Sequence, residues 1–288
     1  MQVKKAQMLI DANAYLGSWP FRLLRHRTAE ELAHLLEESG IEQALVSSLD
    51  AVFREDCHSC NIELLQALAG GRGKPARSQA GKLLPLAVTN PTYAGWQAEL
   101  ESLISEAGEP ADPARAGIAG IRLHPSYHGY DVCGDECAQV VEWACEHGLP
   151  VFIAVRLQDE RQHHPACQVA AVPVGGILRL CQRVKGASIV ACMVRLGEAE
   201  KLLADESARR ATLMCDLSGI QGPAGCIDKL VGKFGSGRLL FGTGVPLQYP
   251  LPAVKKLEFA RVSEAQRREI GSENWLRLSS AAAAEKVE

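Results

Sequence analysis

Eight short apolar runs alternate with longer helical patterns along the chain, and this alternation constrains the fold more than any other feature. The runs lack the alternating polarity of half-exposed strands, as expected for parallel strands covered on both faces. They are MLIDA (8–12), QALVSS (43–48), LLPLAV (83–88), GIRLH (120–124), VFIAV (151–155), SIVAC (188–192), TLMCD (212–216) and RLLFG (238–242). Eight strand–helix units predict a (β/α)8 TIM barrel of the α/β class.

Helical patterns with recognisable ends lie between these strands. Thr28 and Glu31 form a capping box that opens a helix over 29–39, and Gly40 is suited to end it. Further helical patterns cover 61–70, 94–106, 135–147, 173–184, 197–203, 223–234 and 263–278, and a Gly-rich basic surface loop covers 70–81. No repeat or linker divides the chain, so we expect one domain over residues 1–288. A doubly wound open sheet is the alternative, but no GxGxxG or GxxxxGK(S/T) motif follows any strand.

Composition excludes several classes of partner. The chain has 288 residues, is 47% hydrophobic and carries a formal net charge of -3, so it lacks the basic excess typical of nucleic-acid-binding proteins. No apolar run approaches the ~20 residues that span a bilayer, and the N-terminus turns polar too soon for a signal peptide. We therefore expect a cytoplasmic protein without nucleic-acid or membrane partners. The sequence leaves a homo-oligomer open.

The ten cysteines are scattered over a large chain instead of forming the dense framework of a small secreted domain. We expect most of them to be reduced, core-filling side chains. The one tight pair, Cys57 and Cys60, has CxxC spacing, which also occurs in redox-active pairs and in half-sites for zinc. No second CxxC or suitably spaced histidine pair completes a zinc site, so a structural or incidental pair is favoured.

Reactive groups of a (β/α)8 barrel lie at the carboxyl ends of its strands, so the strand list becomes a list of candidate site residues. The strand ends supply Asn13, Tyr15, Trp19, Arg22, His124, Tyr127, His128, Tyr130, Asp131, Arg156, Asp159, Arg161, His163, His164, Cys192, Arg195, Asp216, Ser218, Thr243 and Gly244. Four of the eight histidines fall in two of these loops, which favours a site role for them over a core or turn role.

Seven segments resemble, in order and spacing, the amidohydrolase superfamily, specifically the amidohydrolase-2 branch that includes aminocarboxymuconate-semialdehyde decarboxylase. The segments are IDANAYLG (10–17), LLPLAVTNPTY (83–93), GIRLHPSYHGYDV (120–132), LPVFIAV (149–155), TLMCDLSG (212–219), RLLFGTGVP (238–246) and SENWLRL (272–278). The resemblance covers nearly the whole chain and implies a barrel like those of the metal-dependent hydrolases.

The resemblance also implies a divalent metal, held by two first-strand histidines, a fifth-strand histidine, often a sixth-strand histidine, and an eighth-strand aspartate. The residues at these positions are here, in the same order, Asn13 and Tyr15, Ala154, Cys192 or Met193, and Gly244. Alanine and glycine offer no side-chain ligand, and asparagine is a poor ligand for a transition metal. We therefore predict that the metal centre of the family is absent and that no cofactor takes its place.

The first functional hypothesis is a metal-independent hydrolase or decarboxylase that acts on a small anionic carbonyl compound. Arginine side chains can hold a carboxylate through paired hydrogen bonds, and a histidine with a pKa near ~6.5 can act as a general acid or base. We assign catalytic roles to His124, His128, His164 and Asp216, and substrate binding to Asn13, Tyr15, Trp19, Arg22, Arg122, Tyr127, Arg156 and His163.

Two alternatives stay open. The chain could be a non-catalytic pseudoenzyme that binds a metabolite or partner, because the family ligands are lost together. A metal could also be relocated, bound either by His163 and His164 with Asp159, or by His124 with His128. The second pair spans Pro125, which argues against a simple helical pairing of the two imidazoles.

Overall fold

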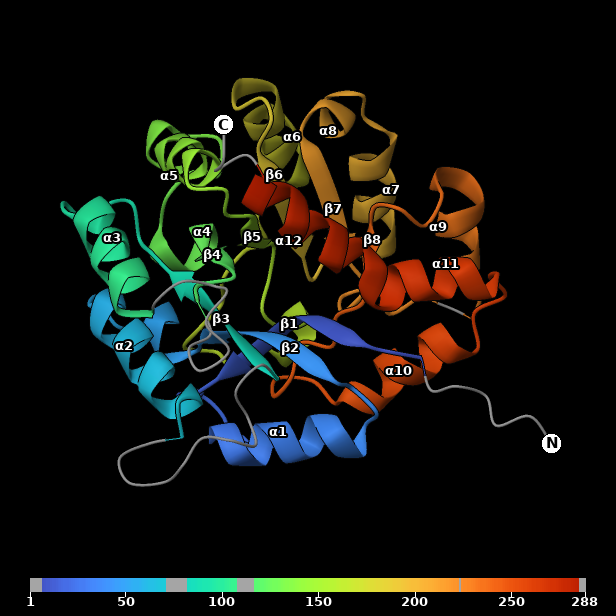
Figure 1. Cartoon of the computed structure of the whole chain (residues 1–288), viewed down its shortest axis with the longest axis horizontal. Coiled ribbons are helices and arrows are strands. Elements are labelled where there is room, and N and C mark those ends of the chain that lie inside the picture. Colours follow the sequence, from blue (N-terminus) through green and yellow to red (C-terminus); the bar gives the residue numbers. More distant parts are fainter. Residues whose placement is uncertain (1–6, 71–81, 108–116, 223, 285–288) are drawn as a thin grey trace.

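The eight predicted strands form one parallel sheet. The computed structural model describes residues 7–70, 82–107, 117–222 and 224–284, so all but the first residue of the loop predicted at 70–81 lies outside the described residues. The strands are β1 (Ile10–Leu16), β2 (Gln43–Ser48), β3 (Leu83–Val88), β4 (Gly120–Leu123), β5 (Val151–Ala154), β6 (Ser188–Cys192), β7 (Thr212–Asp216) and β8 (Leu239–Leu240). Each strand pairs in parallel with the next in sequence order, which confirms the (β/α)8 barrel (Figure 1).

The barrel closes between β1 and the segment that follows β8. Ala12 N–H donates to Phe241 O at 2.9 Å. Further along, Tyr15 N–H donates to Val245 O at 2.8 Å. Because these bonds extend β1 to Leu16, the strand runs beyond the predicted 8–12, and Asn13 and Tyr15 lie within it.

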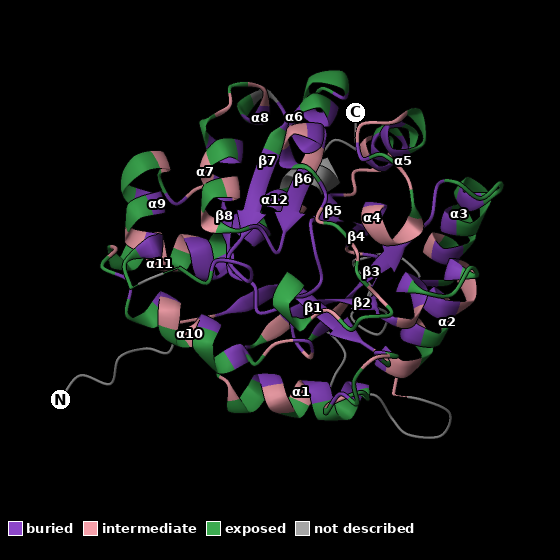
Figure 2. Ribbon diagram, turned by 180° about the vertical axis from the view of Figure 1, so that it is seen from behind, coloured by how far each residue is buried: buried purple, intermediate pink, exposed green. Residues whose placement is uncertain are grey.

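Helices surround the sheet and turn their exposed sides outward (Figure 2). They are α1 (Ala29–Glu38), α2 (Cys57–Leu68), α3 (Trp96–Ala107), α4 (Pro125–His128), α5 (Asp135–Glu146), α6 (Val174–Arg183), α7 (Leu196–Ala204), α8 (Ser207–Arg210), α9 (Cys226–Phe234), α10 (Pro250–Glu258), α11 (Glu264–Arg268) and α12 (Asn274–Ala284). The predicted capping box of Thr28 and Glu31 is confirmed at the start of α1. None of the helices in the described part of the chain is long and apolar enough to cross a membrane.

Several helical elements differ from the sequence-based expectation, among them α2, which begins at Cys57, and the short helices α4 and α8, which were not predicted. The single helix predicted over 263–278 is α11, a π-helical turn at Glu269–Glu273, and α12. The helix predicted over 223–234 begins only at Cys226. Helix α10 was not predicted, because its prolines suppress the helical pattern, although proline is favourable in a first helical turn.

The interior of the barrel is apolar at its amino-terminal end. Every strand except β4 contributes a buried apolar side chain to this region. These side chains are Ile10, Leu45, Leu86, Phe152, Val190, Met214 and Leu240. Helix α12 lies across this end in Figure 1 and inserts Trp275, whose ring centroid is 6.0 Å from that of Phe152. The side chain of Asn274 donates 2.8 Å hydrogen bonds to the carbonyls of Ser236 and Leu239, which fixes α12 to the entry of β8.

The cysteines pack as expected. All ten are free, and seven are buried. Burial raises the pKa of the Cys57 thiol to about 12 and that of Cys60 to about 11. Both thiols are therefore protonated near neutral pH, which suits a structural pair and not a reactive one.

Gly219, in the loop after β7, packs closely against the backbone of the loop after β6. A Cβ there would lie 2.6 Å from the carbonyl oxygens of Met193 and Val194. We expect Gly219→Ala to lower the free energy of unfolding by about 1–3 kcal/mol because backbone must move. The matched control is Gly232→Ala in α9, where nothing lies within 4 Å of the added Cβ. That variant should keep or slightly raise stability. Urea denaturation measures both variants, and equal stability of the two would contradict the close approach.

Candidate functional site

A buried arginine lies at the centre of the polar, carboxyl-terminal half of the barrel. Arg122 extends from β4 and is 0% exposed. Its Nη1 donates to Asn13 Oδ1 at 3.0 Å and lies 3.4 Å from Tyr15 Oη. The guanidinium carbon also lies 5.1 Å from the centroid of the Tyr15 ring. The two residues at the first-strand metal positions therefore both contact one cation.

Arg122 stays charged although it is buried. Burial acts to lower its pKa, but Tyr15, Cys192 and Asp216 outweigh that effect, and its pKa is raised. Among the described residues, Nε and Nη2 have no hydrogen-bond partner. Buried donors are almost always paired in folded proteins. The guanidinium thus retains two donors that a carboxylate or carbonyl oxygen could use.

A hydrogen-bonded chain leads from Arg122 to the ends of β6 and β7. Asn13 Nδ2 donates to Ser218 Oγ at 2.9 Å, and Ser218 Oγ donates to Asp216 Oδ2 at 2.7 Å. The other oxygen of Asp216 accepts from Met193 N–H at 2.7 Å. Burial raises the pKa of Asp216 in spite of these bonds and of the charge on Arg122. Asp216 is therefore more basic than an exposed aspartate.

A second buried carboxyl group joins β1 to the segment after β8. Asp11 Oδ1 accepts from the backbone N–H groups of Asn13 and Thr243, both at 2.9 Å, and Oδ2 accepts from the Thr243 hydroxyl. Burial raises the pKa of Asp11 to about 6, although these bonds oppose the shift. Asp11 thereby fixes the backbone around Asn13.

One imidazole lies near Arg122, and a second imidazole lies next to the first. His124 follows β4 and is 0% exposed, and among the described residues neither of its ring nitrogens has a partner. Its ring centroid is 6.3 Å from that of Tyr15 and 5.7 Å from that of His128. Burial, with His128 and Arg122, holds the pKa of His124 well below its usual range. Burial also lowers the pKa of His128, whose Nε2 lies 3.0 Å from Ala51 O.

The expectation that Pro125 prevents a helical pairing of His124 and His128 is wrong, because His128 N–H donates to His124 O at 2.9 Å. Pro125 occupies the first turn of α4, His124 is the N-cap, and His128 is in the last turn. Proline is tolerated at this place because its missing N–H has no helical acceptor. The short helix α4 therefore brings the imidazoles together.

Aromatic rings cover the site on one side. Trp19 is 4% exposed, and its ring centroid lies 5.1 Å from Phe53, 6.1 Å from Phe21 and 6.3 Å from Tyr127. His164 is exposed and stacks on Phe21 with ring centroids 5.3 Å apart. The structure thus places Trp19, Tyr127 and His164 in one aromatic group at the rim, with His164 on its outside.

The remaining predicted arginines and His163 lie apart from the buried imidazoles. Arg156 makes paired 2.7 and 2.5 Å hydrogen bonds to Glu198, and its Nη1 also donates to Met193 O at 2.7 Å. Its charge is therefore matched by a carboxylate, and it holds the β6 loop. Arg22 donates to Leu247 O at 2.8 Å at the edge of a pocket. His163 is half-buried and directly follows a short turn at Glu160–Gln162.

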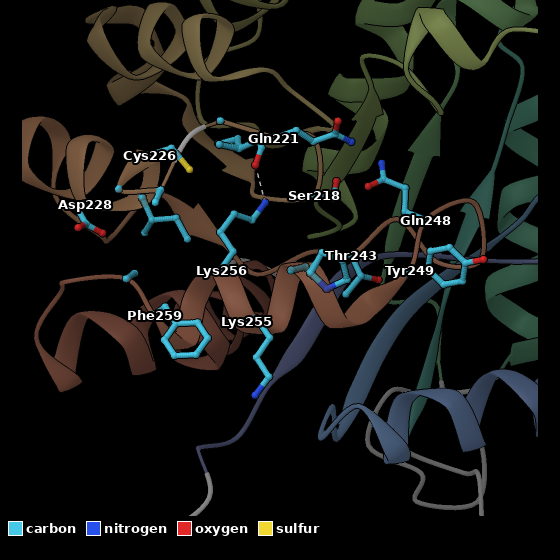
Figure 3. Close-up of a pocket in the computed structure, with 18 of the residues that line it drawn as sticks. Ser218, Gln221, Cys226, Asp228, Thr243, Gln248, Tyr249, Lys255, Lys256 and Phe259 are labelled. Atoms are coloured by element: carbon cyan, nitrogen blue, oxygen red, sulfur yellow. Dashed lines mark hydrogen bonds between the residues drawn. The ribbon is translucent and has the colours of Figure 1, made fainter.

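A cavity of about 620 Å3 opens between the loop after β7 and helix α10 (Figure 3). Ser218, Thr243 and Gln248 lie at one end of it, and Phe259 lies at the other. Lys256 lies between them, and its Nζ donates to the carbonyls of Leu217 and Ile220 at 3.0 and 2.6 Å. Ser218 thus belongs to both the buried chain of hydrogen bonds and this cavity.

Sequence reasoning did not assign a role to Ser218, Gln248 or Lys256. Ser218 was visible as a strand-end residue two positions after Asp216. The other two lie in and before α10, which the sequence did not predict. Their place at the cavity follows from tertiary structure alone.

The residues present do not fit the metal of the family. The cation of Arg122 already contacts Asn13 and Tyr15. Burial raises the pKa of the Cys192 thiol to about 12, so the thiol is protonated near neutral pH. Gly244 has a φ of 77°, which a side-chain-bearing residue rarely adopts. Within the described ranges, no group of three His, Cys, Asp or Glu side chains could hold a metal ion.

The fold and the site define a (β/α)8 barrel with a buried guanidinium in its polar half. No family model and no curated protein sequence matches the chain. Solved structures match it over almost its full length. Dihydroxybenzoic acid decarboxylase from Polaromonas sp. JS666, with bound manganese and the inhibitor 2-nitroresorcinol, is 16% identical with a TM-score of 0.70, covering 95% of this chain and 97% of that one.

Two further decarboxylases match similarly. The 2,6-dihydroxybenzoate decarboxylase complexed with 2,6-dihydroxybenzoate is 14% identical with a TM-score of 0.67. The 5-carboxyvanillate decarboxylase from Sphingomonas paucimobilis is 14% identical with a TM-score of 0.66. Each match covers 95% of this chain and 99% of the other. At such identities the likeness shows the fold, and it confirms the fold that the sequence resemblance implied.

The low pKa of His124 predicts a specific dependence of stability on pH. A histidine whose pKa is lowered by folding does not affect stability well above pH ~6.5, where it is neutral in both states. Below about pH 6.5 the unfolded state binds a proton that the folded state does not, so stability falls by up to about 1.4 kcal/mol per pH unit. Between pH 7.5 and 5.5 the wild type should therefore lose more unfolding free energy than His124→Gln does. Urea denaturation at both pH values measures this difference. His34→Gln, at an exposed position in α1, controls for removal of an imidazole. Equal losses in the wild type and His124→Gln would show that His124 is not a buried neutral imidazole.

Proposed function

We propose that this chain is a cytosolic enzyme, a hydrolase or decarboxylase of a small anionic carbonyl compound, that works without the metal centre of its structural relatives. The observation that carries the proposal is Arg122, a buried cation with two unused donors beside the neutral imidazole of His124. A guanidinium in a water-poor site stabilises negative charge that develops on a carboxylate or carbonyl oxygen. A neutral imidazole next to it can accept or return a proton.

The other residues have supporting roles in this proposal. Asn13 and Tyr15 orient Arg122, and Arg156 with Glu198 holds the loop after β6. Trp19 and Tyr127 cover the site and exclude water, while Arg22 attracts anions at the rim of the cavity. The likeness to decarboxylases, one of them complexed with 2,6-dihydroxybenzoate, supports a small carboxylate as the substrate class.

Non-catalytic binding is the second candidate, because the cavity beside Ser218 can hold a ligand although neither Arg122 nor His124 is exposed in it. Turnover of a panel of small carboxylates, esters and lactones, followed by chromatography, separates the two. The proposal expects turnover that falls about 100-fold or more in His124→Gln, the contribution typical of a general acid or base. His34→Gln is the control and should keep full activity. Saturable binding without turnover, or undiminished activity in His124→Gln, would contradict the enzymatic role.

Arg122 should also determine affinity for a carboxylate. Replacing it by methionine removes the charge and leaves Asn13 Oδ1 without its donor. We expect Arg122→Met to weaken binding of a small carboxylate about 10-fold or more, as for loss of a charge-assisted hydrogen bond. Isothermal titration calorimetry measures the affinity, and circular dichroism checks the fold. Arg54→Met, at an exposed ion pair with Glu63, is the control. Unchanged affinity in Arg122→Met would place the ligand elsewhere.

A further inference from the structure

We infer that Ser218 is a catalytic nucleophile, with Asp216 as its general base, for small esters or lactones that carry a carboxylate. The inference rests on the proposed function and assigns a reacting atom to it. Ser218 is the member of the buried hydrogen-bonded chain that lines the cavity of about 620 Å3 (Figure 3).

The geometry around Ser218 Oγ suits a nucleophile. Its proton points to Asp216 Oδ2 at 2.7 Å, and Asn13 Nδ2 donates to it from the other side at 2.9 Å. Asn13 is held in turn by Arg122, so the hydroxyl is oriented by a rigid, buried network. A hydroxyl beside a carboxylate of raised basicity is the arrangement that nucleophilic catalysis requires.

A candidate donor for the developing oxyanion lines the same cavity as the hydroxyl. Ser218 Oγ and Gln248 Nε2 both contact the sulfur of Met193, at 3.4 and 3.0 Å. A thioether is a weak acceptor, and Gln248 can exchange it for an oxyanion. Met193 itself has a φ of 60°, and Asp216 and Arg156 hold its backbone. Strained residues of this kind are common at functional sites.

The charges around the cavity define the class of substrate. Arg22, Lys255 and Lys256 line it together with one acidic residue, Asp228. Lys255 is paired with Glu258, and Asp228 accepts from Arg261 N–H. Because basic side chains outnumber acidic ones in the lining, the cavity favours an acyl compound that carries a carboxylate.

The reaction balances with water as the only co-reactant. Ser218 Oγ bonds to the carbonyl carbon while its proton passes to Asp216 Oδ2. The bond to the leaving oxygen then breaks, and that oxygen takes the proton from Asp216. Water attacks the acyl-enzyme and gives a proton to Asp216, which returns it to Ser218 as the carboxylic product leaves.

A fluorophosphonate tests the assignment in the wild-type protein. Ser218 Oγ should displace fluoride from phosphorus, and peptide mass spectrometry should locate one phosphonyl group on Ser218. Ser59, which donates to Asp56 at 2.5 Å on the surface, is the control within the same digest. No adduct, or an adduct on Ser59 instead of Ser218, would overturn the inference.

Two variants sharpen the test. Ser218→Ala should lose the adduct, and Asp216→Asn should be labelled about 100-fold more slowly, because it lacks the general base. Circular dichroism checks that both variants fold. If they do not fold, the position of the phosphonyl group in the wild-type protein alone tests whether Ser218 is the nucleophile. Turnover of carboxylates without an adduct on Ser218 would refute only this inference. An adduct without turnover of any carboxylate would instead count against the proposed function.

Discussion

The hydrogen bond from Arg122 to Asn13, deep in the polar half of the barrel, is the interaction on which the rest of the site depends. A buried guanidinium is costly unless other groups compensate its charge. Here the compensation comes from the ring and hydroxyl of Tyr15, the amide of Asn13 and the negative charge on Asp216. Removal of any of them would leave a buried charge or a buried donor unsatisfied.

Burial is the main cause of the shifted pKa values near this cation, and the charge of Arg122 modifies them. Arg122 adds to the fall in the pKa of His124 and opposes the rise in the pKa of Asp216. It also fixes the amide of Asn13, whose other end holds Ser218 at the cavity. A metal ion in a related barrel would supply positive charge to a substrate in this region. In this chain, the proposed source of that charge is a side chain of β4.

The barrel, and the strand ends at which its polar residues lie, could be predicted because both follow from local patterns. Apolar runs, the capping box at Thr28 and the rule of carboxyl strand ends need only neighbouring residues. The partners could not be predicted, because they are distant in sequence. Asn13 forms a hydrogen bond with Ser218, which is 205 positions away in the sequence. Arg156 forms one with Glu198, which is 42 positions away. The sequence therefore offered Arg122 and Arg156 as equivalent arginines, whereas the structure pairs only Arg156 with a carboxylate and places Arg122 against an amide and a phenol.

The metal content of the protein tests the central claim most directly. The protein would be purified from medium supplemented with manganese and zinc and measured by elemental analysis, beside Asn13→Ala. The account predicts that neither protein holds a stoichiometric metal, since Arg122 occupies the region between Asn13 and Tyr15. One tightly bound equivalent in the wild type that is lost in Asn13→Ala would contradict it.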